Sequence, residues 1–214
     1  MAETMTMNRV IHAAVRRDLD RLATALDAAP HNDRARAGDL QRAFVNLHAQ
    51  LKHHHEQEDQ HVFPALRRLG IDTSLIEEMD GEHHAMSEAL QTTASRMQRY
   101  ADTGSAADAA AARTSVEETR VVVERHLAHE EGELEPLMQP HLASAEWKQV
   151  EKALRRAAPT TTGRFFAWVT DGMDPESHAY MRATIPGPVI TVFSKVFGRR
   201  YHREVATVWR ATPQ

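Results

Sequence analysis

Two segments of this 214-residue chain repeat one arrangement of polar residues within apolar helical stripes. His54 precedes Glu58 by four residues, His126 precedes Glu130 by the same spacing, and a proline follows ten residues after each histidine. Residues four apart lie on the same face of an α-helix, one turn from each other. Each segment therefore presents an imidazole and a carboxylate on one helix face. Two such faces opposite each other would outline a site for two metal ions.

Apolar periodicity predicts four long helices, over residues 8–29, 39–69, 72–100 and 109–138. A break at Pro30, a stop at Gly70 and a loop over residues 101–108 separate them. Long helices with short connections favour an all-α fold, an up-down four-helix bundle. Pro64 and Pro136 should bend or end the second and fourth helices just past their His–Glu pairs.

The two halves of the predicted bundle echo each other. His12 and His83 lie 71 residues apart, and His54 and His126 lie 72 apart. These polar groups fall on stripes formed otherwise by Leu, Val, Met and Phe, where an unpaired charge is costly. One such residue would be a hydrogen-bonded core histidine, but six on four helices need a shared positive charge. We therefore predict six metal ligands: His12, His54, Glu58, His83, His126 and Glu130.

Composition narrows the chemistry. The chain has no cysteine, which excludes disulfides, zinc–thiolate sites and iron–sulfur clusters. Imidazole and carboxylate ligands suit iron, manganese or zinc, and a nitrogen-rich site bridged by carboxylates favours two iron ions. The net charge of −4 gives no general attraction to nucleic acid. Apolar runs are too short to span a membrane, and we expect a cytoplasmic protein that is a monomer or a homodimer.

The pattern changes after Pro140, so we divide the chain into a bundle over residues 1–140 and a helical extension over 141–214, packed on the bundle. A fifth helix is predicted over residues 144–158, with a serine cap. Residues 189–209 have apolar positions at helical spacing with basic residues between them. We expect that apolar face to cover the bundle or a partner subunit. The alternative is an amphipathic helix lying on a membrane surface.

Most other histidines are predicted at the surface. Consecutive helical residues point about 100° apart, so at most one of residues 53–55 should face the core. We therefore expect His53 and His55 in solvent, as well as His84. His61 follows Glu58 by three residues near the same stripe, and is a candidate supplementary ligand or a partner of a ligand. The histidines without a spacing argument are expected at the surface: His31, His141, His178 and His202.

These residues resemble the hemerythrin family, specifically its bacterial branch with a His–His–Glu signature in each half. The resemblance covers about residues 8–140 and rests on six ligand positions, their helix order and both trailing prolines. It implies a four-helix bundle that holds an oxo-bridged pair of irons. By position, Glu58 and Glu130 would bridge the two irons, and the four imidazoles would complete the ligand set: His12, His54, His83 and His126.

Two departures from the invertebrate oxygen carriers of that family bear on function. Those proteins place two histidines four apart on the third helix, whereas Met79 and Ser87 stand four residues from His83 here. Their last bridging residue is an aspartate five residues after the fourth-helix histidine, whereas Glu130 follows His126 by four. The missing histidine argues against reversible oxygen carriage and favours redox chemistry with dioxygen, peroxide or nitric oxide.

Two other interpretations stay open: a non-catalytic iron- or oxygen-binding or sensing protein, and a helical interaction module with incidental histidines. Glu58 and His61 also form an ExxH motif of the ferritin-like kind, but the bundle lacks the second such motif that this fold needs.

Overall fold

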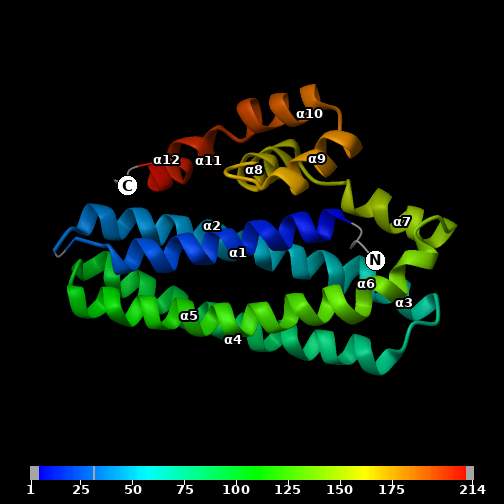
Figure 1. Ribbon diagram of the computed structural model, residues 1–214, viewed down its shortest axis with the longest axis horizontal. Helices are drawn as coiled ribbons and strands as arrows, with labels where there is room; N and C mark the ends of the chain where they lie inside the picture. The colour runs from blue at the N-terminus through cyan, green and yellow to red at the C-terminus, as the bar shows by residue number, and fades with distance from the viewer. Residues whose placement is uncertain (1–4, 31, 211–214) are drawn as a thin grey trace.

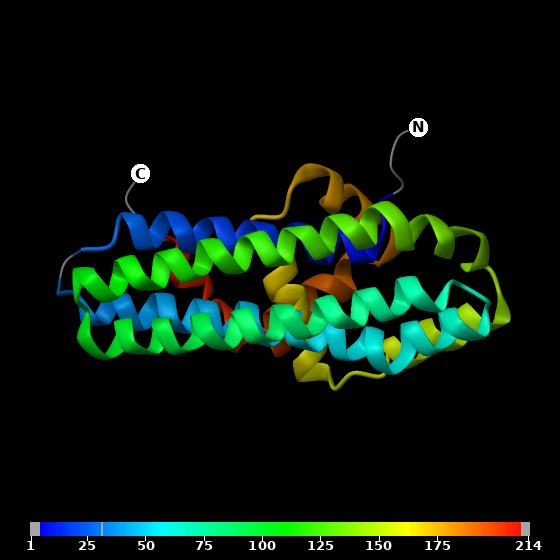
Figure 2. The same cartoon turned by 90° about the horizontal axis from the view of Figure 1, so that it is seen from below.

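The computed structural model describes residues 5–30 and 32–210 (Figures 1 and 2). These residues are mostly helical and include no strand. Four long helices lie side by side, and each packs against two others in the cyclic order α1, α2, α4, α5. The predicted all-α four-helix bundle is therefore confirmed. Its long helices are α1 Met7–Asp27, α2 Arg34–Gln57, α4 Thr73–Thr103 and α5 Ala106–His129.

Short polar residues fix where the bundle helices begin. The side-chain oxygens of Thr6, Asp33 and Ser105 each accept a hydrogen bond from the backbone N–H three residues later. The loop predicted over residues 101–108 is wrong in length, because only Gly104 and Ser105 lie between α4 and α5. Gly104 has a φ of 65°, in the left-handed region where glycine is favoured. This residue and the serine cap suffice for the reversal, so the alanine-rich flanks stay helical.

The second and fourth long helices widen into a π turn at corresponding points, Glu58–Val62 and Glu130–Leu134. Short helices then continue each rod, α3 (Phe63–Arg68) and α6 (Glu135–Met138), the latter followed by a 3-10 turn at Gln139–His141. A proline ring clashes with the carbonyl four residues earlier and offers no N–H, and a wider turn relieves both problems. The interruption thus begins at the glutamate itself rather than past it.

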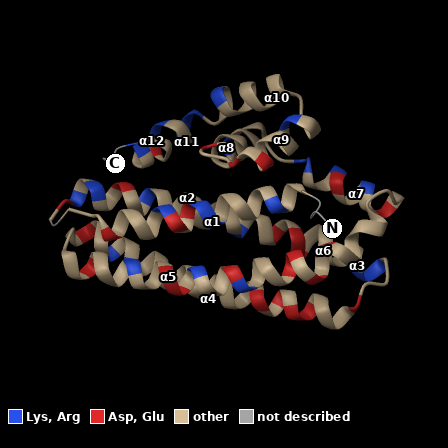
Figure 3. Cartoon of the chain, viewed as in Figure 1, with Lys and Arg blue, Asp and Glu red and all other residues tan. Residues whose placement is uncertain are grey.

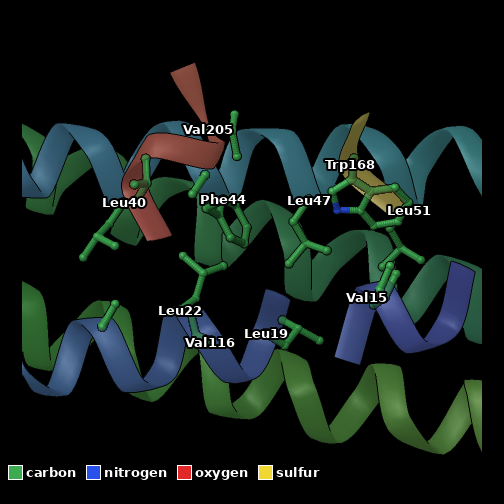
Figure 4. Close-up of a cluster of buried hydrophobic side chains, with 14 of the residues drawn as sticks. Val15, Leu19, Leu22, Leu40, Phe44, Leu47, Leu51, Val116, Trp168 and Val205 are labelled. Atoms are coloured by element: carbon green, nitrogen blue, oxygen red, sulfur yellow. The ribbon is translucent and has the colours of Figure 1, made fainter. Parts of the chain in front are cut away.

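The apolar core of the bundle is split in two. The larger cluster includes Leu19, Phe44, Leu47 and Val116, and Figure 4 shows part of it. The smaller cluster surrounds the π turns, with Phe63, Leu66, Ile76, Met79 and Leu134. A compact domain usually has one contiguous core. The layer between the two clusters contains the polar residues described below.

The segment after the bundle is a chain of short helices laid across the face formed by α1 and α2 (Figure 1). In chain order they are α7 Ala145–Leu154, α8 Pro159–Val169, α9 Pro175–Thr184, α10 Gly187–Val192, a π turn Phe193–Phe197, α11 Arg199–Glu204 and α12 Ala206–Arg210. Ser144 caps α7 as predicted, and α7 packs against α3 and the first π turn. The boundary at residue 140 as a domain limit stays a prediction.

A buried polar contact ties the extension to the bundle. Trp168 is fully buried, and its indole N–H donates to the carboxylate of Asp18 at 2.8 Å. Arg17 donates to the other oxygen of the same carboxylate at 2.9 Å. Asp18 is therefore a buried charge with two donors, which is the condition under which such burial is tolerated.

The prediction for residues 189–209 is correct for its C-terminal part only. Tyr201, Val205 and Val208 are buried against the bundle, whereas Val192 and Val196 are exposed. The segment is broken into several short pieces, so one continuous apolar face does not form. Within the described residues, no helix has the length and apolar character to cross a bilayer.

Candidate metal centre

The structure brings all six predicted ligands together in the layer that divides the core. Together with His55, they form two groups, in each of which one donor atom per residue lies within 4.8 Å of the others. One group comes from α2, the first π turn, α4 and α5: His55, Glu58, His83 and His126. The other comes from α1, α2 and the second π turn: His12, His54 and Glu130.

Each glutamate reaches both groups. One oxygen of Glu58 lies 3.2 Å from Nε2 of His54, and the other lies 3.5 Å from Nε2 of His83. One oxygen of Glu130 lies 3.2 Å from Nε2 of His12 and 3.8 Å from Nε2 of His126. Both carboxylates therefore lie close to imidazoles of both groups.

The expectation that His55 points into solvent is wrong. Its side chain is 7% exposed, belongs to the first group and stacks on the ring of His83 at a centroid distance of 4.1 Å. Helix α2 packs against both α1 and α4, so two adjacent residues can each face a different neighbour. His54 contacts His12 of α1, and His55 contacts His83 of α4. The buried side of a bundle helix is wide enough for both.

The donor set fits metal ions, because several of its buried nitrogen and oxygen atoms have no hydrogen-bond partner. Within the described residues, ten buried side-chain nitrogen or oxygen atoms have no hydrogen-bond partner, and half of them lie in this layer. Buried polar atoms without a partner are rare in folded proteins and call for an explanation. Cations placed between them would use these lone pairs as ligands. The five atoms are Nε2 of His55, His83 and His126, Oε2 of Glu58 and Oε2 of Glu130.

Outer carboxylates orient three of the imidazoles. Nδ1 of His12 lies 2.7 Å from Glu131, Nδ1 of His83 lies 2.9 Å from Asp59, and Nδ1 of His126 lies 3.0 Å from Glu82. A ring that donates its Nδ1–H to a carboxylate turns the Nε2 lone pair inward, which is the usual support of a metal-bound histidine. Sequence reasoning did not identify Asp59, Glu82 or Glu131 as partners of these rings. Each is the residue next to a predicted ligand.

Charges within the layer shift the pKa values in opposite directions. Burial, together with the neighbouring Glu130, raises the pKa of Glu58 well above its ordinary value. Burial also acts to raise the pKa of Glu130, but the hydrogen bond and charge of His12 outweigh it and lower the value. Burial lowers the pKa of His12, yet hydrogen bonds to Glu130 and Glu131 prevail and raise it to about 9. Without cations, the layer thus favours protonation at Glu58 and His12.

His61 is not in either group. It is half-buried and lines a small pocket against α7, together with Gln60, Pro64 and Arg68. The π turn explains the difference, because a stripe extrapolated at 3.6 residues per turn no longer holds inside it. Among the remaining histidines, His84 and His178 are exposed, whereas His53, His141 and His202 are half-buried. His31 lies outside the described residues.

Comparison with known families agrees with this arrangement. The family model of the hemerythrin HHE cation-binding domain matches residues 8–138, which spans the bundle and every residue of the two groups. Neither the curated proteins nor the solved structures give a match. Because the matched region exceeds half of the chain and its metal-binding residue types converge in space, the protein belongs to the hemerythrin HHE cation-binding domain family.

Proposed function

We propose that the protein holds two iron ions between the two groups and uses them to bind and reduce a small oxidant: dioxygen, peroxide or nitric oxide. The observation that carries this proposal is the pair of glutamates, each within reach of imidazoles from both groups. Two carboxylates and five imidazoles, with no thiolate, suit iron, while manganese and zinc remain alternatives for the same ligands.

Unequal numbers of imidazoles give the two metal positions different roles. His55, His83 and His126 belong to one group, and His12 and His54 to the other. If both glutamates are shared, the second position would have fewer protein ligands. The oxidant would therefore approach on the side of His12 and His54. The six predicted residues and His55 are proposed as the ligands.

The chain's own residues support such chemistry by orientation and by exclusion of water. Glu131, Asp59 and Glu82 hold three imidazoles in the tautomer that turns Nε2 inward. Phe63 stacks on His83 from the smaller apolar cluster. When bound, a ferrous pair supplies one electron per iron, which with two protons reduces hydrogen peroxide to two waters.

The test measures the iron content of the protein and its consumption of hydrogen peroxide. Protein reconstituted with ferrous iron should hold two irons per chain and consume hydrogen peroxide over repeated cycles when a reductant is supplied. Replacing His55 with leucine should lower both iron content and turnover, while the control His84→Gln, beside His83 but exposed, should change neither. Stable binding of two irons without any turnover would contradict the redox part of the proposal.

A second candidate function is reversible binding of dioxygen without turnover. The burial of His55 favours it, because this residue supplies a fifth imidazole that the third helix lacks. An absorption change that reverses when oxygen is removed, with no consumption of peroxide, would select this function over the first.

A further inference from the structure

A pocket of about 190 Å³ lies where the extension meets α2, and no residue that lines it belongs to the two groups of the metal centre. Its walls come from α2 on one side and from α8 and α11, with the residue that follows α11, on the other. Figure 3 shows basic residues in the segment of α11 and α12 that lies over the bundle, and all of them are arginines. The lining residues are Gln41, Arg42, Val45, Arg164, Arg200, Tyr201, Glu204 and Val205.

Positive charge exceeds negative charge in this pocket. Three arginines line it, but only one carboxylate, that of Glu204. Arg42 pairs with Asp39 of its own helix, and Arg200 donates to Glu204 at 2.7 Å. Arg164 differs, because its Nε donates at 2.9 Å to the neutral side-chain oxygen of Asn46. Within the described residues, no carboxylate forms an ion pair with Arg164.

Arg164 is also half-buried, unlike the exposed Arg42 and Arg200. Burial lowers its pKa, the positive charge of Arg200 adds to that effect, and the charge of Glu204 offsets it only in part. A partly buried guanidinium that no carboxylate contacts directly is costly, and an anion placed between it and Arg200 would relieve that cost. Planar guanidinium groups match the oxygen atoms of phosphate by paired hydrogen bonds.

We propose that this pocket binds a small, doubly charged oxyanion, either free phosphate or the phosphate group of a small monoester, through Arg164, Arg200 and Arg42. The volume lies below the roughly 300–1,000 Å³ of pockets for drug-sized ligands, so the occupant is small. Val45 and Val205 offer an apolar wall for the few carbon atoms of a monoester. Because the arginines come from both sides of the junction, the anion fastens the extension to α2 and stabilises the folded chain.

Isothermal titration calorimetry of the full chain tests this, at constant ionic strength adjusted with chloride. One arm uses inorganic phosphate and the other uses glycerol phosphate. We expect saturable binding of one anion per chain, accompanied by a rise in melting temperature. Arg164→Gln and Arg200→Gln should each weaken binding by about tenfold or more, because each removes charge-assisted hydrogen bonds. Arg155→Gln is the matched control and should leave binding unchanged, because Arg155 is an exposed arginine directly after α7 that pairs with Glu151.

The two arms also identify the source of the anion. Tighter binding of the monoester means that the apolar wall is used, and equal binding means that phosphate alone suffices; both support the pocket. Absence of saturable binding in both arms would overturn the proposal. So would binding that survives in both arginine variants, because that phosphate must be held elsewhere, such as at the metal centre. If Arg164→Gln does not fold, Arg200→Gln decides alone, since Arg200 is exposed.

Discussion

Replacing Glu58 with glutamine should stabilise the metal-free protein and impair metal binding. Glu58 is 4% exposed, and its Oε2 has no hydrogen-bond partner. Burial and the nearby Glu130 carboxylate raise its pKa well above the ordinary value, so the folded chain disfavours the ionised form. Glutamine has nearly the same shape and no charge, and its amide can donate to Glu130. The substitution therefore removes the penalty together with the proposed bridge.

The magnitude follows from the cost of a buried charge. Replacing a buried ion pair by well-packed hydrophobic residues of similar volume is neutral to stabilising by about 1–4 kcal/mol, and we take this as the scale for one buried carboxyl group. For a chain of this length, 1 kcal/mol shifts the melting temperature by about 2–4 °C. At pH 7 we expect a stabilisation in the lower half of that range, about 1–2.5 kcal/mol, so the metal-free variant should melt about 2–10 °C above the wild type.

The stability difference between Glu58→Gln and wild type depends on pH. A carboxyl group with a raised folded pKa contributes its full stability below the unfolded value of 4.5 and loses it as the pH rises toward the folded pKa. The difference between Glu58→Gln and wild type should therefore vanish near pH 4 and grow toward pH 7.

Thermal unfolding followed by circular dichroism, after chelation and at both pH values, measures this. Glu56→Gln is the control, because Glu56 lies two residues before Glu58 at the end of α2, is 46% exposed and pairs with Lys52 at the surface. It should shift stability by less than about 0.5 kcal/mol. With metal bound, the order should reverse and wild type should melt higher. A metal-free Glu58→Gln variant that melts below wild type at pH 7 would refute the reasoning.

Three further predictions concern the fold. Gly163→Ala should cost about 1–3 kcal/mol in the free energy of unfolding, because its Cβ would lie 2.4 Å from Cβ of Phe197 and 2.6 Å from a backbone oxygen; an unchanged urea midpoint would contradict the close packing of α8. Trp168→Phe should cost about 1.5–3 kcal/mol by removing the buried hydrogen bond to Asp18, and a double-mutant cycle with Asp18→Asn measures the coupling. Hydrogen bonds from Thr103 and Ser105 lower the pKa of Asp108 from 3.8 to about 2. The stabilisation that the Asp108 carboxylate gives to the start of α5 should therefore be lost only as the pH falls from 3.8 to about 2. An NMR titration of Asp108 with a midpoint near 3.8 would count against those hydrogen bonds.

Much of the bundle could be predicted because its signal is local. Helical stripes and capping residues identify the four rods, and the repeated spacing of His54–Glu58 and His126–Glu130 identifies the groups that converge. The loop at residues 101–108 was predicted too long, because a single left-handed glycine, Gly104, can reverse the chain without a longer break.

The errors at the site have a tertiary origin. Whether His55 faces solvent depends on how α2 packs between α1 and α4. A helical wheel of α2 alone does not show this packing. The position of His61 depends on the π turn that begins at Glu58. Pro64 predicts an interruption of the helix, but it does not predict that the interruption begins at Glu58. The roles of the outer carboxylates Asp59 and Glu131 could not be predicted without the packing of the helices, because their partners lie far away in the sequence.

The metal content of the reconstituted protein tests the central claim most directly. Ferrous iron added without oxygen, followed by removal of unbound metal and elemental analysis, should give two irons per chain for wild type. His84→Gln should also retain two, whereas Glu58→Gln should retain fewer. A wild-type protein that holds no metal, or one whose metal content is the same after Glu58→Gln, would contradict the account of paired cations between the bundle helices.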